Sequence, residues 1–171
     1  MKNKKAVVLL FLCSLYWMAC NPLKPLSMQR MDNKSNKFKL DGYYYSKSAQ
    51  LKNHSGVFVP YSNGVFLEFE GEEEKLQGWK TYLVFINTFT NRKNIPYYKT
   101  VPYGWGVYHV TDENTINLEG WISGDGTYPT IKYFGKVVND TTLIIKGSPR
   151  LDTFYFVPFS PKPDSTNRFI K

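Results

Sequence analysis

The chain has 171 residues, of which 42% are hydrophobic, and its formal net charge is +8 at pH 7. This length suits one domain with short extensions. The lysines and arginines are scattered, and no basic block of the kind that binds phosphates occurs, so the charge gives no pattern for a nucleic-acid partner.

The beginning of the chain reads as a secretory signal that ends at Cys20. Three lysines near the start precede an apolar run over residues 6–19, and the small residue Ala19 stands directly before the cysteine. This order is typical of a cleaved signal peptide, and the run is short for a transmembrane helix, which takes about 20 apolar residues. We therefore expect residues 1–19 to be a signal peptide.

Ala19 and Cys20 resemble the end of the lipobox of bacterial lipoproteins, in which a small residue precedes the lipidated cysteine. The resemblance implies cleavage before Cys20 and lipid attachment to its sulfur as diacylglycerol, usually with a third acyl chain on its amine. Two or three acyl chains make a stable membrane anchor, whereas one chain binds marginally. The alternative is that Cys20 is an ordinary residue of a conventional signal peptide or of an uncleaved anchor.

The processed chain would hold no cysteine except Cys20, because Cys13 lies within the signal. Its domain then has no thiol for a disulfide, a metal site or a nucleophile, and must be held by its core. The chain contains 4 Trp, 13 Tyr and 12 Phe. Aromatic side chains bury large areas and favour strands.

The processed chain divides into three parts. Residues 20–39 are polar, contain two prolines and show no periodicity, so we expect a flexible tether. A β domain is expected over residues 40–159, followed by a polar, proline-containing tail over residues 160–171 whose end Phe169 and Ile170 would pin.

The β domain opens with a predicted strand at residues 40–45. The Asn63-Gly64 dipeptide, the strongest short-range hairpin signal, separates predicted strands at 56–61 and 65–70. Next comes a stretch with three glutamates at its start and apolar residues at steps of three and four, which predicts an amphipathic helix near residues 72–90. The rival interpretation is a buried strand over residues 81–86.

A regular meander follows, with alternating apolar and polar residues between short turns. Its strands are predicted at residues 105–110, 115–122, 130–138, 141–146 and 152–159. Short strands about ten residues apart are typical of an antiparallel barrel or sandwich. We predict a mainly β fold, an antiparallel meander that closes into a barrel, with a β-sandwich as the alternative.

The opening Asp41-Gly42-Tyr43-Tyr44-Tyr45, the segment Trp105-Gly106-Val107-Tyr108 and the lipobox together resemble the lipocalin-like lipoproteins of Bacteroidetes. In true lipocalins a Trp stands where this chain has Tyr44. The resemblance implies a lipocalin-like barrel on a lipid anchor in the cell envelope. In some bacteria acidic residues directly after the lipidated cysteine direct export to the cell surface, and none directly follows Cys20 here. We therefore expect an outer-membrane protein that faces the periplasm.

Catalytic and metal-binding patterns are not found in the sequence. His54 and His109 have no second ligand at a metal-binding spacing, and no Gly-x-Ser-x-Gly motif occurs. Glu68 and Glu70 share one strand face, whereas glycoside hydrolysis needs two carboxylates that face each other across a cleft. We expect no enzyme activity, no cofactor and no metal.

Six aromatic residues are candidates for a ligand pocket, although packing the core is the plainer role for each of them: Tyr43, Tyr45, Trp105, Trp121, Tyr128 and Tyr133. An eight-stranded barrel can be filled by side chains or hold one small ligand. The leading hypothesis is non-catalytic binding of a small hydrophobic or envelope-derived ligand. The alternative is a structural or interaction lipoprotein whose exposed aromatics contact an envelope protein or glycan.

Overall fold

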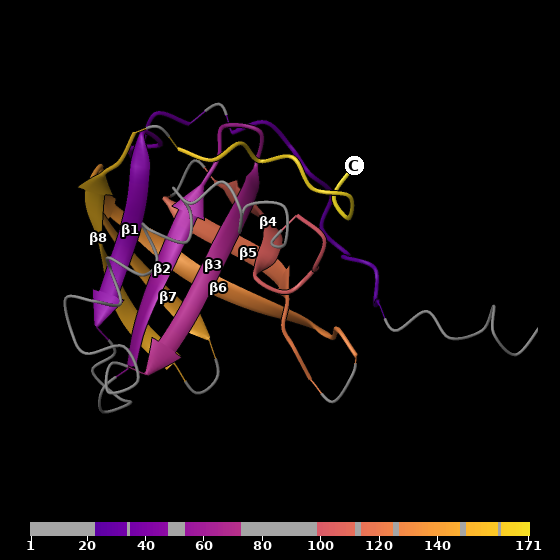
Figure 1. Cartoon of the computed structure of the whole chain (residues 1–171). Coiled ribbons are helices and arrows are strands. Elements are labelled where there is room, and N and C mark those ends of the chain that lie inside the picture. Colours follow the sequence, from indigo (N-terminus) through magenta and orange to yellow (C-terminus); the bar gives the residue numbers. More distant parts are fainter. Residues whose placement is uncertain are drawn as a thin grey trace, which may run out of the picture.

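A computed structural model describes residues 23–33, 35–47, 54–72, 99–111, 114–124, 127–147, 150–160 and 162–171. Its strands form one closed antiparallel barrel in which each strand pairs with its neighbours in sequence, and β1 pairs with β8 to close the sheet (Figure 1). The strands are β1 (Gly42–Lys47), β2 (His54–Pro60), β3 (Val65–Glu72), β4 (Trp105–Val110), β5 (Thr115–Trp121), β6 (Thr130–Asn139), β7 (Thr142–Gly147) and β8 (Arg150–Pro158).

The predicted lipocalin-like barrel is confirmed, and the sandwich alternative is wrong because a single closed sheet contains all eight strands. Each predicted strand matches an observed one to within two residues at either end. At the Asn63-Gly64 hairpin, Gly64 has a φ of 74°, a left-handed conformation that favours glycine.

The helix predicted near residues 72–90 and its rival strand over 81–86 lie outside the described residues, apart from Glu72, which ends β3. The described part of the chain contains no helix long and apolar enough to cross a membrane.

One face of every strand points into the barrel, and its side chains pack against one another there. This inner cluster takes residues from all eight strands, together with Phe38 from the segment before β1: Tyr44, Phe58, Phe66, Tyr108, Ile116, Leu118, Val137, Leu143, Ile145 and Phe154. The ring centroids of Phe58 and Phe66 are 5.3 Å apart, and Phe38 lies 5.9 Å from Tyr44 and 5.8 Å from Tyr108. The aromatic end of the interior is therefore filled by the protein's own rings.

Two glycines on the inner face make room for the ring of Phe66. Gly106 and Gly120 are cross-strand partners on β4 and β5. A Cβ atom would lie 2.4 Å from Phe66 Cζ at Gly106, and 3.0 Å from it at Gly120. Both distances are shorter than ordinary van der Waals contact, so these positions are small because the ring is large.

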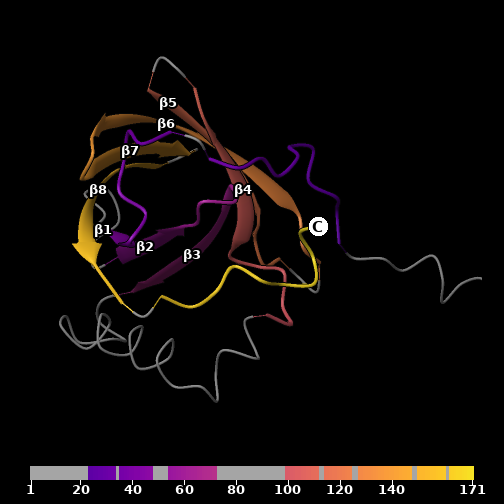
Figure 2. The same cartoon turned by 90° about the horizontal axis from the view of Figure 1, so that it is seen from above.

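The outer face of β1 to β4, with Trp121 of β5, also carries buried apolar side chains, and residues of both terminal segments pack against them. We call its buried residues the outer cluster: Tyr43, Val57, Val59, Tyr61, Val65, Leu67, Trp105 and Trp121. Leu23 and Leu26 from the N-terminal segment and Phe159, Phe169 and Ile170 from the C-terminal segment pack against it. Figure 2 shows the C-terminal segment running along the outside of the barrel and the N-terminal segment crossing its mouth before β1.

The described part of the expected flexible tether differs from that expectation. From Leu23 onward it lies on the barrel, where Leu23 bridges Tyr128 and Phe38 enters the inner cluster. Its few apolar residues supply these contacts, and the polar composition of the stretch concealed them. The tail also lies on the barrel, with the ring of Phe169 6.2 Å from that of Trp121.

Candidate functional site

Five of the six residues proposed for a ligand pocket lie outside the barrel. Tyr43, Trp105 and Trp121 are buried members of the outer cluster, and Tyr45 and Tyr128 pack against it. Tyr133 packs against the inner cluster. The structure therefore gathers five of these aromatics in or beside the outer cluster, and places Tyr133 on the inner face.

The chain's own ends occupy the outer cluster. Trp105 stacks on Tyr61 with centroids 6.3 Å apart, and the ring of Tyr43 meets the edge of Phe159 at 5.9 Å. The indole Nε1 of Trp121 donates to the Lys24 carbonyl oxygen at 2.6 Å. This aromatic group serves to hold the two terminal segments.

Two charged residues fasten these segments to the outer half. Glu119, 1% exposed on β5, accepts hydrogen bonds from the Met28 N–H at 2.6 Å and from Ser27 Oγ at 3.0 and 3.1 Å. Burial raises the pKa of the Glu119 carboxyl, but these hydrogen bonds and the charge of Lys132 outweigh it, so the pKa lies below its usual range. Glu119 is therefore ionised at neutral pH and binds the N-terminal segment as a carboxylate.

Lys162 performs the matching task for the C-terminal segment. Its Nζ donates to the carbonyl oxygen of Leu40 at 2.7 Å and to that of Pro60, and lies 4.6 Å from the centroid of the Tyr61 ring. Burial lowers the pKa of the Lys162 ammonium to about 8, an effect that the charge of Asp41 partly opposes.

The inner face becomes polar beyond the aromatic rings. Ser46 and Asp152 are 1% and 4% exposed, and each lies one strand period from a ring of the inner cluster. Ser46 Oγ has no hydrogen-bond partner in the described part of the chain. Burial, with a further effect from the charge of Glu68, raises the pKa of the Tyr133 phenol. This region is the part of the interior best suited to a polar ligand.

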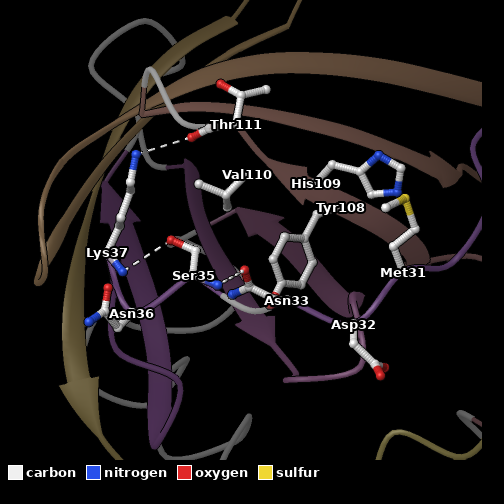
Figure 3. Close-up of a pocket in the computed structure, with 10 residues that line it drawn as sticks. All are labelled: Met31, Asp32, Asn33, Ser35, Asn36, Lys37, Tyr108, His109, Val110 and Thr111. Atoms are coloured by element: carbon white, nitrogen blue, oxygen red, sulfur yellow. Dashed lines mark hydrogen bonds between the residues drawn. The ribbon is translucent and has the colours of Figure 1, made fainter.

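A hollow of about 490 Å³ lies between the N-terminal segment and the end of β4 (Figure 3). Hydrogen bonds within it or to adjoining backbone already engage several of its polar groups: Lys37 Nζ donates to the Thr111 carbonyl oxygen at 3.3 Å, and His109 Nε2 lies 2.7 Å from the Gln29 carbonyl oxygen. Asp32 and Lys37 both line it, so the wall has no single sign of charge. The described residues contain no group of three or more His, Cys, Asp or Glu side chains that could hold a metal ion.

The outer face of β6 to β8 carries four of the six large apolar side chains that are exposed in the described part of the chain. Phe134, Val138, Leu151 and Tyr155 are 58%, 49%, 46% and 59% exposed. We define the bare face as the outward side chains of these strands that are apolar, aromatic or basic, apart from Val157, which packs against the outer cluster: Lys132, Phe134, Lys136, Val138, Ile144, Lys146, Leu151 and Tyr155.

Neither the bare face nor the role of the glycines beside Phe66 was predicted from the sequence. The signal for the face was present on β6, since Phe134 occupies the same alternating positions as Lys132 and Lys136 and interrupts an otherwise polar row. Cys20, the predicted lipid site, lies outside the described residues. Comparisons with protein-family models, with curated proteins and with solved structures found no match to this chain.

Proposed function

We propose that this protein is a lipid-anchored lipoprotein of the bacterial cell envelope that acts without catalysis, as an interaction lipoprotein, through its outer surface. Cys20 carries the acyl chains in this proposal, and the signal over residues 1–19 with Ala19 before the cysteine supports it. The resemblance to lipocalin-like lipoproteins of Bacteroidetes, with the barrel towards the periplasm, is part of the same proposal.

One observation carries the choice of the outer surface over the interior. The aromatic end of the barrel is filled by rings from its own strands and by Phe38, whereas large apolar side chains stay exposed on the bare face. A ligand that entered among the rings would have to displace close-packed side chains. Large apolar side chains gathered on one exposed face are candidates for an interaction site, and here they stand in rows with lysines.

The anchor is tested with two cysteine variants in cells that are supplied with labelled fatty acid. We expect wild type and Cys13→Ala to fractionate with the membrane and take up the label, because Cys13 lies in the signal. We expect Cys20→Ala to take up no label. A wild-type protein that is soluble and unlabelled would contradict the anchor.

A second candidate function is binding of a small polar ligand in the barrel interior, and the hydroxyl of Ser46, which has no hydrogen-bond partner among the described residues, favours it. Mass spectrometry of protein purified under native conditions tests it. A stoichiometric small molecule that is present in wild type and lost in Ser46→Leu would favour this function over the interaction role. A molecule retained by both would lie elsewhere.

A further inference from the structure

We infer that the bare face rests on the anionic surface of the membrane that holds the protein's own acyl chains. The barrel then lies with β6 to β8 against the lipid headgroups and does not stand away on a tether. This inference rests on the proposed function, since it takes Cys20 as the lipid site.

Only a short length of chain separates Cys20 from the barrel. Leu23 already forms a bridge with Tyr128, and the Lys24 N–H donates to the Tyr128 carbonyl oxygen at 3.4 Å. Cys20 precedes Leu23 by three residues. Three residues span at most about 11 Å when fully extended. Acyl chains on Cys20 therefore hold this side of the barrel close to the headgroups.

The N-terminal segment meets the barrel just before β6. Tyr128 lies two residues before β6, which is the first strand of the bare face. On the other side of this attachment point lies the outer cluster, which the terminal segments cover. The first exposed apolar side chain that follows this attachment point along β6 is Phe134 of the bare face.

Apolar and basic side chains alternate across the strands of the bare face. Lys146 is the cross-strand partner of both Phe134 and Leu151, and Ile144 is the partner of Lys136. Lysines in such positions can lay their stems along apolar neighbours while their ammonium groups reach phosphates. Tyr155 adds an aromatic ring with a polar end, the kind of side chain that is enriched at membrane interfaces.

The outward charges of the bare face are positive. No acid points outward from the described residues of β6, β7 and β8, because Asp152 is buried on the inner face. The nearest acids are Glu119, which binds Ser27 and Met28 and also faces Lys132 across β5 and β6, and Asp140, which pairs with Lys39 at 3.5 Å, so the positive charge of Lys136 and Lys146 is the part that no neighbouring strand acid faces. A face with this charge and apolar content is complementary to an anionic bilayer, and a basic patch is a typical second signal beside acyl chains.

The test places thiol-reactive fluorescent labels on the lipidated full-length protein in vesicles of phosphatidylethanolamine and phosphatidylglycerol with a nitroxide quencher in the headgroup region. Phe134→Cys and Tyr155→Cys report the bare face. Met31→Cys is the matched control, because Met31 is 60% exposed but lies in the N-terminal segment. We expect loss of fluorescence at positions 134 and 155 and none at position 31.

A charge variant then tests the lysines in the same vesicles. Lys136→Ala with Lys146→Ala should lower the ratio of docked to undocked protein about 25-fold, since each lysine near an anionic surface contributes about fivefold. Arg30→Ala with Lys37→Ala removes the same charge from the N-terminal segment and should leave the quenching unchanged. If both pairs of substitutions lowered the quenching equally, net charge and not this face would explain the membrane contact, and the inference would be overturned.

Two further results would overturn it. Quenching at position 31 as strong as at positions 134 and 155 would mean that no face is selected. Labels at 134 and 155 that stay bright on vesicles but are shielded in native envelopes would assign the face to a protein or glycan. Failure of the proposed anchor would give a different result. An unacylated Cys20 would itself react with the thiol label, even in the chain without an introduced cysteine.

Discussion

Large apolar side chains point outward on both halves of the barrel's outer surface, but they are buried on one half and exposed on the other. On β1 to β5 the buried outward apolar side chains form the outer cluster, against which residues of both terminal segments pack, and Trp105 is 1% exposed. On β6 to β8 they remain in solvent, and Phe134 is 58% exposed. An outward aromatic is therefore part of the protein's stability in one half and is left available for contact in the other.

The largest effect that tests this contrast is a pair of truncations. We expect Trp105→Ala to lower the free energy of unfolding by about 3–5 kcal/mol, because it removes a buried ring and leaves a cavity. Phe134→Ala should change it by about 0.5 kcal/mol or less, as exposed substitutions generally do. Urea denaturation of both variants, followed by circular dichroism, measures the difference. Equal losses would show that the bare face is covered in the folded protein.

A smaller effect is expected from the carboxylate that holds the N-terminal segment. Glu119→Gln replaces an ionised acceptor by an amide and should lower the free energy of unfolding by about 1–3 kcal/mol. Limited proteolysis should then cut residues 23–33 faster. The exposed Asp32→Asn is the control and should do neither.

The same carboxylate gives a pH dependence with a defined sign. Because its pKa is lowered in the folded state, it adds stability above the ordinary glutamate pKa, and that stability is lost as the pH falls through the lowered value. The loss at acid pH should therefore be smaller in Glu119→Gln than in wild type. Identical acid profiles for the two proteins would argue against this role of Glu119.

The smallest effect concerns Lys162 on the C-terminal segment. Its pKa is about 8 in the folded state against an ordinary 10.5, so between these values the unfolded chain binds more protons. Stability should then rise with pH across this window, by about 1–2 kcal/mol once partial solvent screening is allowed for.

Lys162→Met isolates this contribution. Buried tyrosines, which lower stability as they ionise above pH 10 in the unfolded chain, affect wild type and variant alike, so the difference between the two proteins reports Lys162. A difference that is flat from pH 8 to pH 10 would show that the ammonium is well solvated in the folded protein.

The sequence was sufficient for the strands because turn residues and alternation agree along the meander. The Asn63-Gly64 hairpin and the rows of β6 and β7 are local patterns that the barrel preserves. The packing of the N-terminal segment was not predictable, since it depends on Leu23, Leu26 and Phe38 meeting surfaces that are distant in sequence.

The pocket residues were misplaced for a related physical reason. Alternation tells which residues share a face, but it does not tell which face is the inside when both are apolar. On β1, Tyr43 and Tyr44 are adjacent and both 0% exposed, one in the outer cluster and one in the inner cluster. Apolar residues on both faces of β1 to β3 were the signal that something covers the barrel outside.

The short pairing between β3 and β4 has a consequence for how the barrel opens. Only Val65, Phe66 and Leu67 of β3 pair with β4, whereas seven residues of β2 pair with β3. Among the described residues this is the shortest strand pairing of the barrel. The ring of Phe66 packs across it against Gly106 and Gly120. Opening of the sheet at this pairing would leave β3 and β4 as two free edges.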